Sequence, residues 1–129
     1  MKNIGWIGLG KMGLPMALKL AGQKHKLSVF NRTKSKTSDL VAAGASAEDN
    51  VASVAKKSDI TITMVSDDFA LERIALGSDG VLKNAKPNST FIDMSTVSPG
   101  LSAKISEAAA AKNINYLRAP VNGTVMQAE

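Results

Sequence analysis

The stretch Gly8-Leu9-Gly10-Lys11-Met12-Gly13 directly follows a short apolar segment, Ile4-Gly5-Trp6-Ile7, at the start of the chain. In such a run the first glycine lets the backbone turn sharply out of a strand, and the second lets a pyrophosphate approach without a Cβ in the way. The third allows the next helix to pack against the strand. The N–H groups and the positive end of that helix then face the phosphates. The spacing therefore predicts a dinucleotide-binding loop over residues 8–13.

The residues after the glycines have the pattern of a βαβ unit. Apolar residues recur at three- and four-residue spacing as far as Ala21, with Pro15 in the first turn, which predicts a helix that ends near residues 23–26. The β-branched and aromatic content of residues 27–30 predicts a short buried strand. Strand, glycine turn, helix and strand within about thirty residues match the length of a βαβ unit. This context favours dinucleotide binding over an ordinary glycine turn in another α/β protein.

The segment after the second predicted strand reads Asn31-Arg32-Thr33-Lys34-Ser35-Lys36. A preference for NAD normally shows here as Asp or Glu, which accepts a hydrogen bond from the ribose 2′-OH, and this segment has neither. Arg32 can instead form forked hydrogen bonds to a 2′-phosphate, and Lys36 can add a point charge. We therefore predict that NADP is favoured over NAD, with Asn31, Arg32, Thr33 and Lys36 at the cofactor. The alternative is a solvated helix start with Thr33 or Ser35 as its N-cap.

The rest of the chain alternates predicted helices and strands without a linker or repeat. A helix is expected after Thr33, and Gly44 should end it. Beyond Gly44 the pattern predicts strands at 45–46, 60–65, 90–94 and 115–117 and helices at 48–57, 69–76 and 103–112. We therefore expect one α/β domain over residues 1–129. Its fold should be a Rossmann-type doubly wound parallel sheet with helices on both faces.

Composition narrows the function further. The chain has 129 residues, of which 44% are hydrophobic, no cysteine and one histidine, so we expect a packed domain without a metal site or a Ser-His relay. The net charge is +5, but few aromatic residues accompany the basic ones, which favours an anionic cofactor over nucleic acid. We see no secretory signal and no membrane span, and predict a cytoplasmic location.

Ligands of doubly wound sheets lie beyond the carboxyl ends of the strands, where three further segments are expected. These are Val65-Ser66-Asp67, Ser95-Thr96-Val97-Ser98-Pro99 and Pro120-Val121-Asn122-Gly123-Thr124. Their hydroxyl and amide groups suit a nicotinamide, a ribose or a small carboxylate substrate. Ordinary turn chemistry is the alternative for each, since Ser98-Pro99 resembles a helix start and Asn122-Gly123 a tight turn. Their common position at one edge of the sheet favours a functional site.

Three ordered motifs resemble those of the β-hydroxyacid dehydrogenases. The motifs are the glycine signature at 8–17, Asp93-Met94-Ser95-Thr96 and Ala119-Pro120-Val121-Asn122-Gly123. This family includes 3-hydroxyisobutyrate dehydrogenase and the glyoxylate and succinic semialdehyde reductases, and its cofactor domain is similar to that of 6-phosphogluconate dehydrogenase. Asn31-Arg32-Thr33 with Lys36 is similar to the NADP-using reductase branch. The resemblance implies hydride transfer between nicotinamide and a small β-hydroxyacid or semialdehyde.

The resemblance also implies roles for single residues. It implies that the cofactor is contacted by Val65, Ser66, Ala70 and Thr96. It implies that a carboxylate-bearing substrate is contacted by Ser95, Thr96, Asn122 and Gly123. Two positions depart from the family pattern. Serine is usual where Asn122 stands, and an acidic residue or glycine where Arg118 stands, so the substrate pocket is expected to differ in size and charge.

The catalytic lysine that the resemblance implies lies in a helical second domain after the third motif, whereas this sequence ends at Glu129. We therefore expect no catalytic residue in this chain, which alone should bind NADP(H) but turn over little or nothing. Full-length relatives are expected to form homo-oligomers through that second domain. Two alternatives stay open: an imine-reductase-like enzyme domain, against which Ser95-Thr96 argues mildly, and a non-catalytic NADP-binding module.

Overall fold

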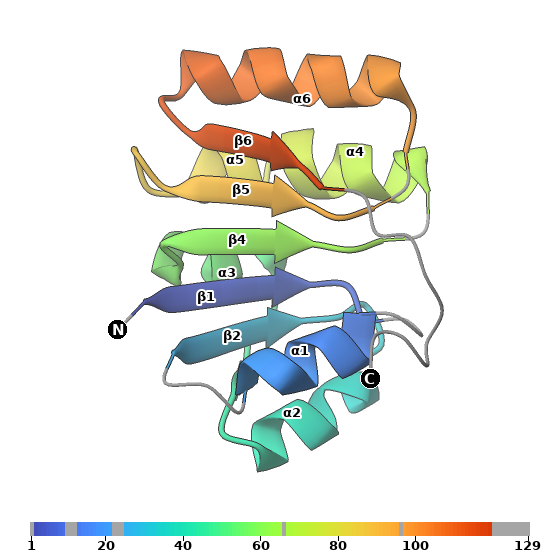
Figure 1. Cartoon of the computed structure of the whole chain (residues 1–129), viewed down its shortest axis with the longest axis vertical. Helices are drawn as coiled ribbons and strands as arrows, with labels where there is room; N and C mark the ends of the chain where they lie inside the picture. The colour runs from blue at the N-terminus through green and yellow to red at the C-terminus, as the bar shows by residue number, and fades with distance from the viewer. Residues whose placement is uncertain (1, 10–12, 22–24, 66, 96, 120–129) are drawn as a thin grey trace.

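A six-stranded parallel sheet forms the centre of the molecule in the computed structural model (Figure 1). The structure describes residues 2–9, 13–21, 25–65, 67–95 and 97–119. The strand order is β3-β2-β1-β4-β5-β6, and every neighbouring pair is parallel. The order reverses between β1 and β4, which is where a doubly wound sheet opens a crevice for a ligand. The predicted fold class is confirmed.

The strands lie close to their predicted positions. They are β1 Asn3–Ile7, β2 Lys26–Phe30, β3 Ser46–Ala47, β4 Ile60–Thr63, β5 Thr90–Asp93 and β6 Asn115–Arg118. The helices are α1 Gly13–Ala21, the 3₁₀ helix η1 Lys34–Thr37, α2 Ser38–Ala42, α3 Val51–Lys57, α4 Asp68–Leu76, α5 Val81–Asn84 and α6 Pro99–Ala111. Gly44 follows α2 with a φ of 107°, as expected of a residue that ends a helix.

Several helix bounds differ from the sequence prediction. The pattern does not indicate α5, because a helix of four residues is too short to show a periodicity. The last helix, α6, begins at Pro99 rather than near residue 103, since the Ser98 side chain caps its first turn. The first helix, α1, covers Gly13–Ala21, and its predicted end near residues 23–26 lies partly outside the described residues. None of these differences changes the order of the sheet.

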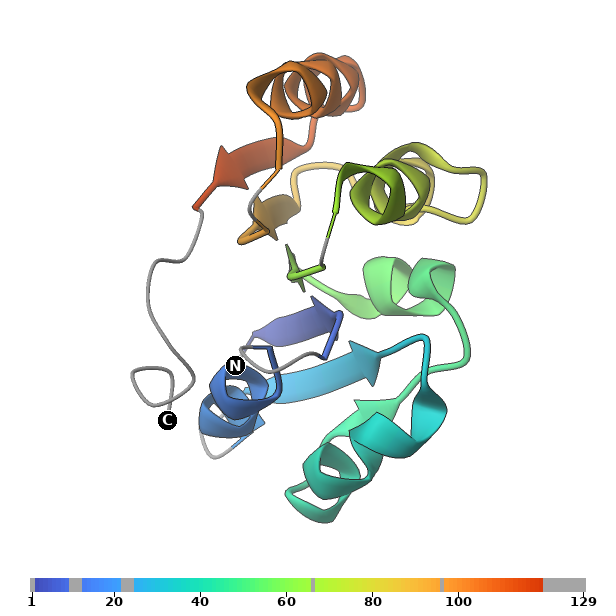
Figure 2. The same ribbon diagram turned by 90° about the vertical axis from the view of Figure 1, so that its right-hand side faces the viewer.

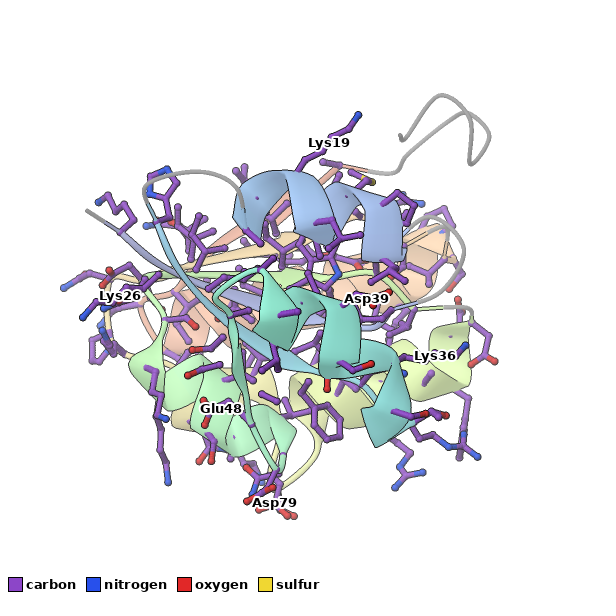
Figure 3. The ribbon with its side chains drawn as sticks, turned by 90° about the horizontal axis from the view of Figure 1, so that it is seen from below. Lys19, Lys26, Lys36, Asp39, Glu48 and Asp79 are labelled. Atoms are coloured by element: carbon purple, nitrogen blue, oxygen red, sulfur yellow. The ribbon has the colours of Figure 1, made fainter. Side chains whose placement is uncertain are left out.

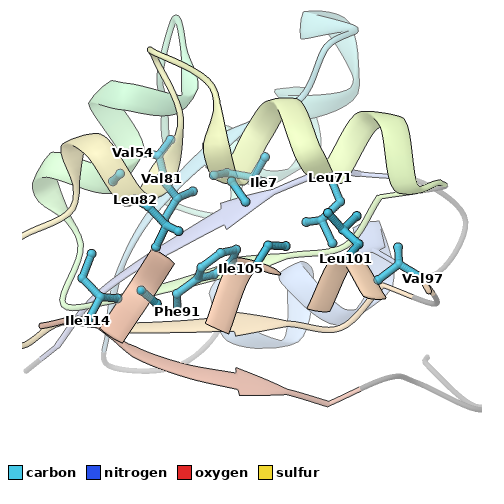
Figure 4. Close-up of a cluster of buried hydrophobic side chains, with 13 residues drawn as sticks. Ile7, Val54, Leu71, Val81, Leu82, Phe91, Val97, Leu101, Ile105 and Ile114 are labelled. Atoms are coloured by element: carbon cyan, nitrogen blue, oxygen red, sulfur yellow. The ribbon is translucent and has the colours of Figure 1, made fainter. Parts of the chain in front are cut away.

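Two apolar cores hold the helices against the sheet. The core beneath α3, α4, α5 and α6 includes Ile7, Leu71, Phe91 and Ile105, each at most 1% exposed (Figure 4). The other core joins the sheet to α1 and α2, and Trp6 is its largest buried side chain. Figures 1 and 2 show the sheet between these two groups of helices. Across the parts of the chain that the structure describes, no helix combines the length and the apolar character that crossing a membrane requires.

Asp59 ties the start of β4 to the start of β1. Its carboxylate accepts a hydrogen bond from the Asn3 backbone N–H at 3.0 Å and forms an ion pair with the Lys86 Nζ at 3.3 Å. The Asn3 hydrogen bond, and then Lys86, lower the pKa of Asp59 from its ordinary value of 3.8. A carboxyl whose pKa is lowered by folding stabilises the fold above its ordinary pKa. This stabilisation is lost as the pH falls through the folded-state value.

We therefore expect Asp59→Asn to destabilise the domain at neutral pH, and the difference from the unmodified chain to shrink as the pH falls from about 5 to about 2. Urea unfolding at a series of pH values measures this difference. Asp79→Asn, in the loop before α5, is the matched control for removing a surface carboxylate. A difference that stayed constant down to the lowest pH would show that the Asp59 charge contributes nothing.

Candidate cofactor site

The carboxyl ends of the strands meet at one edge of the sheet, which faces the viewer in Figure 2. At this edge the first residues after four strands donate backbone hydrogen bonds to the neighbouring strand. The bonds run from Gly8 to Phe30 at 3.1 Å, Met64 to Ile7 at 2.9 Å, Met94 to Thr63 at 2.8 Å and Ala119 to Asp93 at 2.8 Å. The segments predicted to form the site therefore leave the sheet side by side.

Gly8 and Gly13 have the backbone roles that the spacing predicts. Gly8 turns out of β1 with a φ of 100°, and a Cβ there would overlap the carbonyl oxygen of Met64. A Cβ on Gly13 would lie 2.5 Å from the Gly8 carbonyl oxygen, so α1 begins closer to the end of β1 than a side chain permits. The three residues between them that complete the predicted loop, Gly10, Lys11 and Met12, lie outside the described residues.

Trp6 supports the glycine turn from inside the sheet. Its side chain is 1% exposed, and its indole Nε1 donates a hydrogen bond to the Gly8 carbonyl oxygen at 2.9 Å. The sequence does not indicate this role, because a tryptophan in a buried strand is expected for packing alone. The only sequence signal is that a residue with a polar N–H lies two positions before the first glycine.

Asn31 links the glycine loop to the segment after β2. Its Oδ1 accepts a hydrogen bond from the Leu9 N–H at 2.7 Å, and its Nδ2 donates to the Thr33 carbonyl oxygen at 3.0 Å. Both polar ends of the side chain are therefore committed to backbone groups. Asn31 shapes the predicted cofactor site, and the exposed residues after it provide the groups that can reach a ligand.

The segment after Asn31 leads into the 3₁₀ helix η1, for which the sequence leaves the N-cap open between Thr33 and Ser35. Thr33 occupies the N-cap position, but its side chain makes no capping hydrogen bond, and Ser35 lies inside η1. The turn is closed instead by the Lys36 backbone N–H, which donates to the Thr33 carbonyl oxygen at 3.1 Å. The Thr33 hydroxyl is therefore not committed to a cap.

The exposed basic residues Arg32 and Lys36 follow the carboxyl end of β2. Figure 3 shows Lys36 on the side of the molecule where the strands end, while Lys26, at the start of the same strand, lies at the opposite end. A ligand phosphate beyond the sheet edge is thus closer to Lys36 than to Lys26. The arrangement suits the forked guanidinium and the point charge predicted for a 2′-phosphate.

The segments after β4 and β5 are joined by a side chain. The Val65 backbone N–H donates to the Ser95 Oγ at 2.8 Å, and the Ser95 backbone N–H donates to the Asp93 Oδ1 at 3.1 Å. Ser95 is 2% exposed, so its hydroxyl lies against Val65 beneath the surface where a substrate was expected. Ala70 lies in the first turn of α4, where its N–H donates to Asp67 at 2.8 Å.

The start of α6 is fixed by neighbouring elements. The Ser98 Oγ accepts from the Leu101 N–H at 3.3 Å, which confirms the helix-start interpretation of Ser98. The Ser98 N–H donates to Asp68 at 2.9 Å, and hydrogen bonding by the Ser98 side chain and backbone lowers the pKa of the Asp68 carboxyl. Arg118, the departure from the family pattern, donates to the Val97 carbonyl oxygen at 2.7 Å. Its guanidinium is therefore hydrogen-bonded to the backbone of this segment.

We expect Ser98→Ala to lower the free energy of unfolding by about 1 kcal/mol, because the first turn of α6 loses its cap. Denaturant unfolding measures the change. Ser106→Ala, at an exposed position farther along α6, is the matched control and should cost little. If both variants lost the same stability, the cap would have no special role.

Several expected site residues lie outside the described residues, namely Ser66, Thr96, Asn122 and Gly123. Where the chain is described, no three His, Cys, Asp or Glu side chains gather as metal ligands.

A doubly wound sheet with a glycine turn after β1 and a basic segment after β2 defines a dinucleotide-binding domain. Over residues 3–129 the chain matches the family described as the NAD binding domain of 6-phosphogluconate dehydrogenase. The chain belongs to this family.

Similar proteins include several oxidoreductases. The chain is 44% identical over 121 residues to the uncharacterized oxidoreductase YfjR of Bacillus subtilis, covering 94% of this chain and 42% of that protein. It is 40% identical over 127 residues to glyoxylate/succinic semialdehyde reductase 1 of Arabidopsis thaliana, covering 98% and 44%. The structure of Mycobacterium tuberculosis 3-hydroxyisobutyrate dehydrogenase with L-serine superposes with a TM-score of 0.88 at 30% identity, covering 98% and 42%. The chain therefore spans less than half the length of these relatives.

Proposed function

We propose that this chain is the NADP(H)-binding domain of an oxidoreductase that transfers hydride between nicotinamide and a small β-hydroxyacid or semialdehyde. The observation that carries the proposal is the link from the glycine turn through Asn31 to the basic segment after β2. This link connects a loop that can bind a pyrophosphate to side chains whose positive charge can bind a 2′-phosphate. The relatives named for glyoxylate, succinic semialdehyde and 3-hydroxyisobutyrate support the substrate class.

The described residues fit a dinucleotide. Gly8 and Gly13 keep the turn free of side chains where a Cβ would overlap backbone atoms. Arg32 and Lys36 are exposed beside this turn and can bind a phosphate that a carboxylate would repel. When bound, the nicotinamide ring supplies or accepts the hydride. The glycine turn, Arg32 and Lys36 would hold the cofactor, and the segments after β4 and β5, which leave the sheet beside this turn, would line the rest of its site.

The substrate side belongs to the same proposal. Thr96, Asn122 and Gly123 are proposed to bind the substrate, while Ser95 is proposed to hold the segment after β4 through the hydrogen bond that its Oγ accepts from the Val65 N–H. We propose that the general acid or base of the complete enzyme comes from outside residues 1–129. The chain alone should then bind NADP(H) without appreciable turnover.

Calorimetric titration with NADPH and with NADH tests the proposal directly. We expect NADPH to bind at least about tenfold more tightly, because a forked charged hydrogen bond to phosphate is lost with NADH. Binding of neither nucleotide would reject the cofactor function, and tighter NADH binding would reject the NADP assignment. Oxidation of NADPH by succinic semialdehyde with this chain alone would contradict the location of the acid or base.

A further inference from the structure

We propose that Asp93 is a positioning residue that acts through Ser95 on the backbone at Val65. In this way it sets the shape of the site where the segments after β4 and β5 meet. The inference builds on the proposed function, since that meeting point is where the nicotinamide ring is placed. Asp93 itself contacts neither cofactor nor substrate in this proposal.

Asp93 is a fully buried carboxyl at the end of β5. It is 0% exposed, and its Oδ1 accepts hydrogen bonds from the Thr63 Oγ1 at 2.9 Å and from the Ser95 N–H at 3.1 Å. Thr63, the last residue of β4, is also 0% exposed. One carboxyl oxygen therefore joins the ends of two strands that lie on the side of the sheet switch point away from β1 and β2.

Ser95 passes this constraint to the next segment. Held through its own N–H by Asp93, it accepts the Val65 N–H with its Oγ at 2.8 Å. The preceding N–H, that of Met64, is bonded to the Ile7 carbonyl oxygen as part of the sheet. Val65 is thus the first residue after β4 whose backbone is held by a side chain. The direction in which this segment leaves the sheet depends on Ser95, and the place of Ser95 depends on Asp93.

Packing alone does not account for a carboxyl at this position. The second oxygen, Oδ2, has no hydrogen-bond partner among the described residues, and a buried polar atom without a partner costs stability. An apolar side chain would avoid this cost. The Asp93 backbone is also shared, since its carbonyl oxygen accepts from the Ala119 N–H at 2.8 Å. Asp93 therefore lies where the segments after β4, β5 and β6 meet.

Amide hydrogen exchange of the cofactor-free chain tests this relay. In Asp93→Ala, exchange at Val65 and Ser95 should be at least about tenfold faster, because the hydrogen bonds that hold both amides are lost or loosened. Exchange at Met64, which is bonded to the sheet, is the internal reference. Asp93→Asn keeps an acceptor at Oδ1 and should restore slow exchange. Thr63→Val removes the bond that is not part of the relay and should leave Val65 unchanged.

Ser95→Ala gives an independent test if Asp93→Ala does not fold. It should accelerate exchange at Val65 and leave Met64 unchanged. The proposal is overturned if Val65 exchange stays at its original rate in Ser95→Ala, or if Met64 accelerates as much as Val65 in the Asp93 variants. It is also overturned if Asp93→Asn behaves like Asp93→Ala.

NADPH titration of the same variants connects the relay to the proposed function. We expect Asp93→Ala to weaken NADPH binding by about tenfold and Asp93→Asn by much less. Equal affinity of Asp93→Ala and the unmodified chain would refute the effect on the cofactor site. Failure of the unmodified chain to bind any dinucleotide would reject the proposed function, while the exchange experiment would still decide the role of Asp93.

Discussion

Gly8→Ala is expected to destabilise the domain by about 2–5 kcal/mol and to abolish NADPH binding. The φ of 100° at Gly8 strains any residue with a Cβ, at about 1–2 kcal/mol. The new methyl group would also overlap the Met64 carbonyl oxygen, and forcing an atom into a packed site costs about 1–3 kcal/mol more. Relief of the overlap must move Gly8 or Met64, and both precede segments of the proposed site. Urea unfolding and calorimetric titration measure the two effects.

Gly44→Ala is the matched control for this substitution. Gly44 has a φ of 107°, but nothing lies within 4 Å of a Cβ built there. It should therefore show the conformational cost alone, about 1–2 kcal/mol, with NADPH binding retained. The difference between the two variants isolates the close approach of β1 to β4. Equal losses of stability, or normal cofactor binding by Gly8→Ala, would show that this approach is unimportant.

Arg32→Asp is expected to weaken NADPH binding by about 100-fold and NADH binding far less. The substitution removes a forked, charge-assisted hydrogen bond to the 2′-phosphate, which contributes about 1.5–3 kcal/mol, and adds a repelling carboxylate. NADH has a 2′-hydroxyl instead, which the new carboxylate can accept as a hydrogen-bond donor. Titration of the variant with both nucleotides at one ionic strength measures the change.

Lys26→Asp separates local contact from general electrostatics. Lys26 is exposed at the start of β2, whereas Arg32 follows the end of the same strand, and both substitutions change the charge by the same amount (Figure 3). We expect Lys26→Asp to have a small, salt-sensitive effect on either nucleotide. Equal losses of NADPH and NADH affinity in Arg32→Asp would refute the role of Arg32 in cofactor choice.

The fold class and most elements could be predicted because they depend on local patterns. The β-branched run at residues 60–63 predicts a buried strand, and the glycine spacing at 8–13 predicts a turn between a strand and a helix. The short helix α5 and the first turn of α6 could not be placed. Helix α5 has only one turn, so it shows no periodicity. The first turn of α6 depends on the Ser98 cap, and the sequence is equally compatible with a functional loop at Ser98.

The candidate site was predictable to a smaller extent. Motif spacing indicates Gly8 and Gly13, whose backbone geometry has the predicted form. It does not indicate that Asn31 and Ser95 use their polar atoms on backbone groups of other segments, because such contacts arise only when distant strand ends meet. The indole of Trp6 and the carboxyl of Asp93 are further examples. The sequence alone indicates which polar residues lie near the strand ends. It does not indicate which of them face a ligand and which of them hold the backbone of the site in place.

The two hydrogen bonds of Asn31 limit how the cofactor preference of this domain can be redesigned or can drift in evolution. An acidic residue at position 31 would place a carboxylate oxygen where Nδ2 now donates, facing the Thr33 carbonyl oxygen 3.0 Å away. The repulsion would disturb the same backbone that shapes the phosphate cradle through Leu9. Under the proposed NADP preference, a change toward NAD would therefore begin at the exposed positions after Asn31. The proposal thus assigns cofactor selectivity to the exposed residues after Asn31, and the shape of the glycine loop to Asn31 itself.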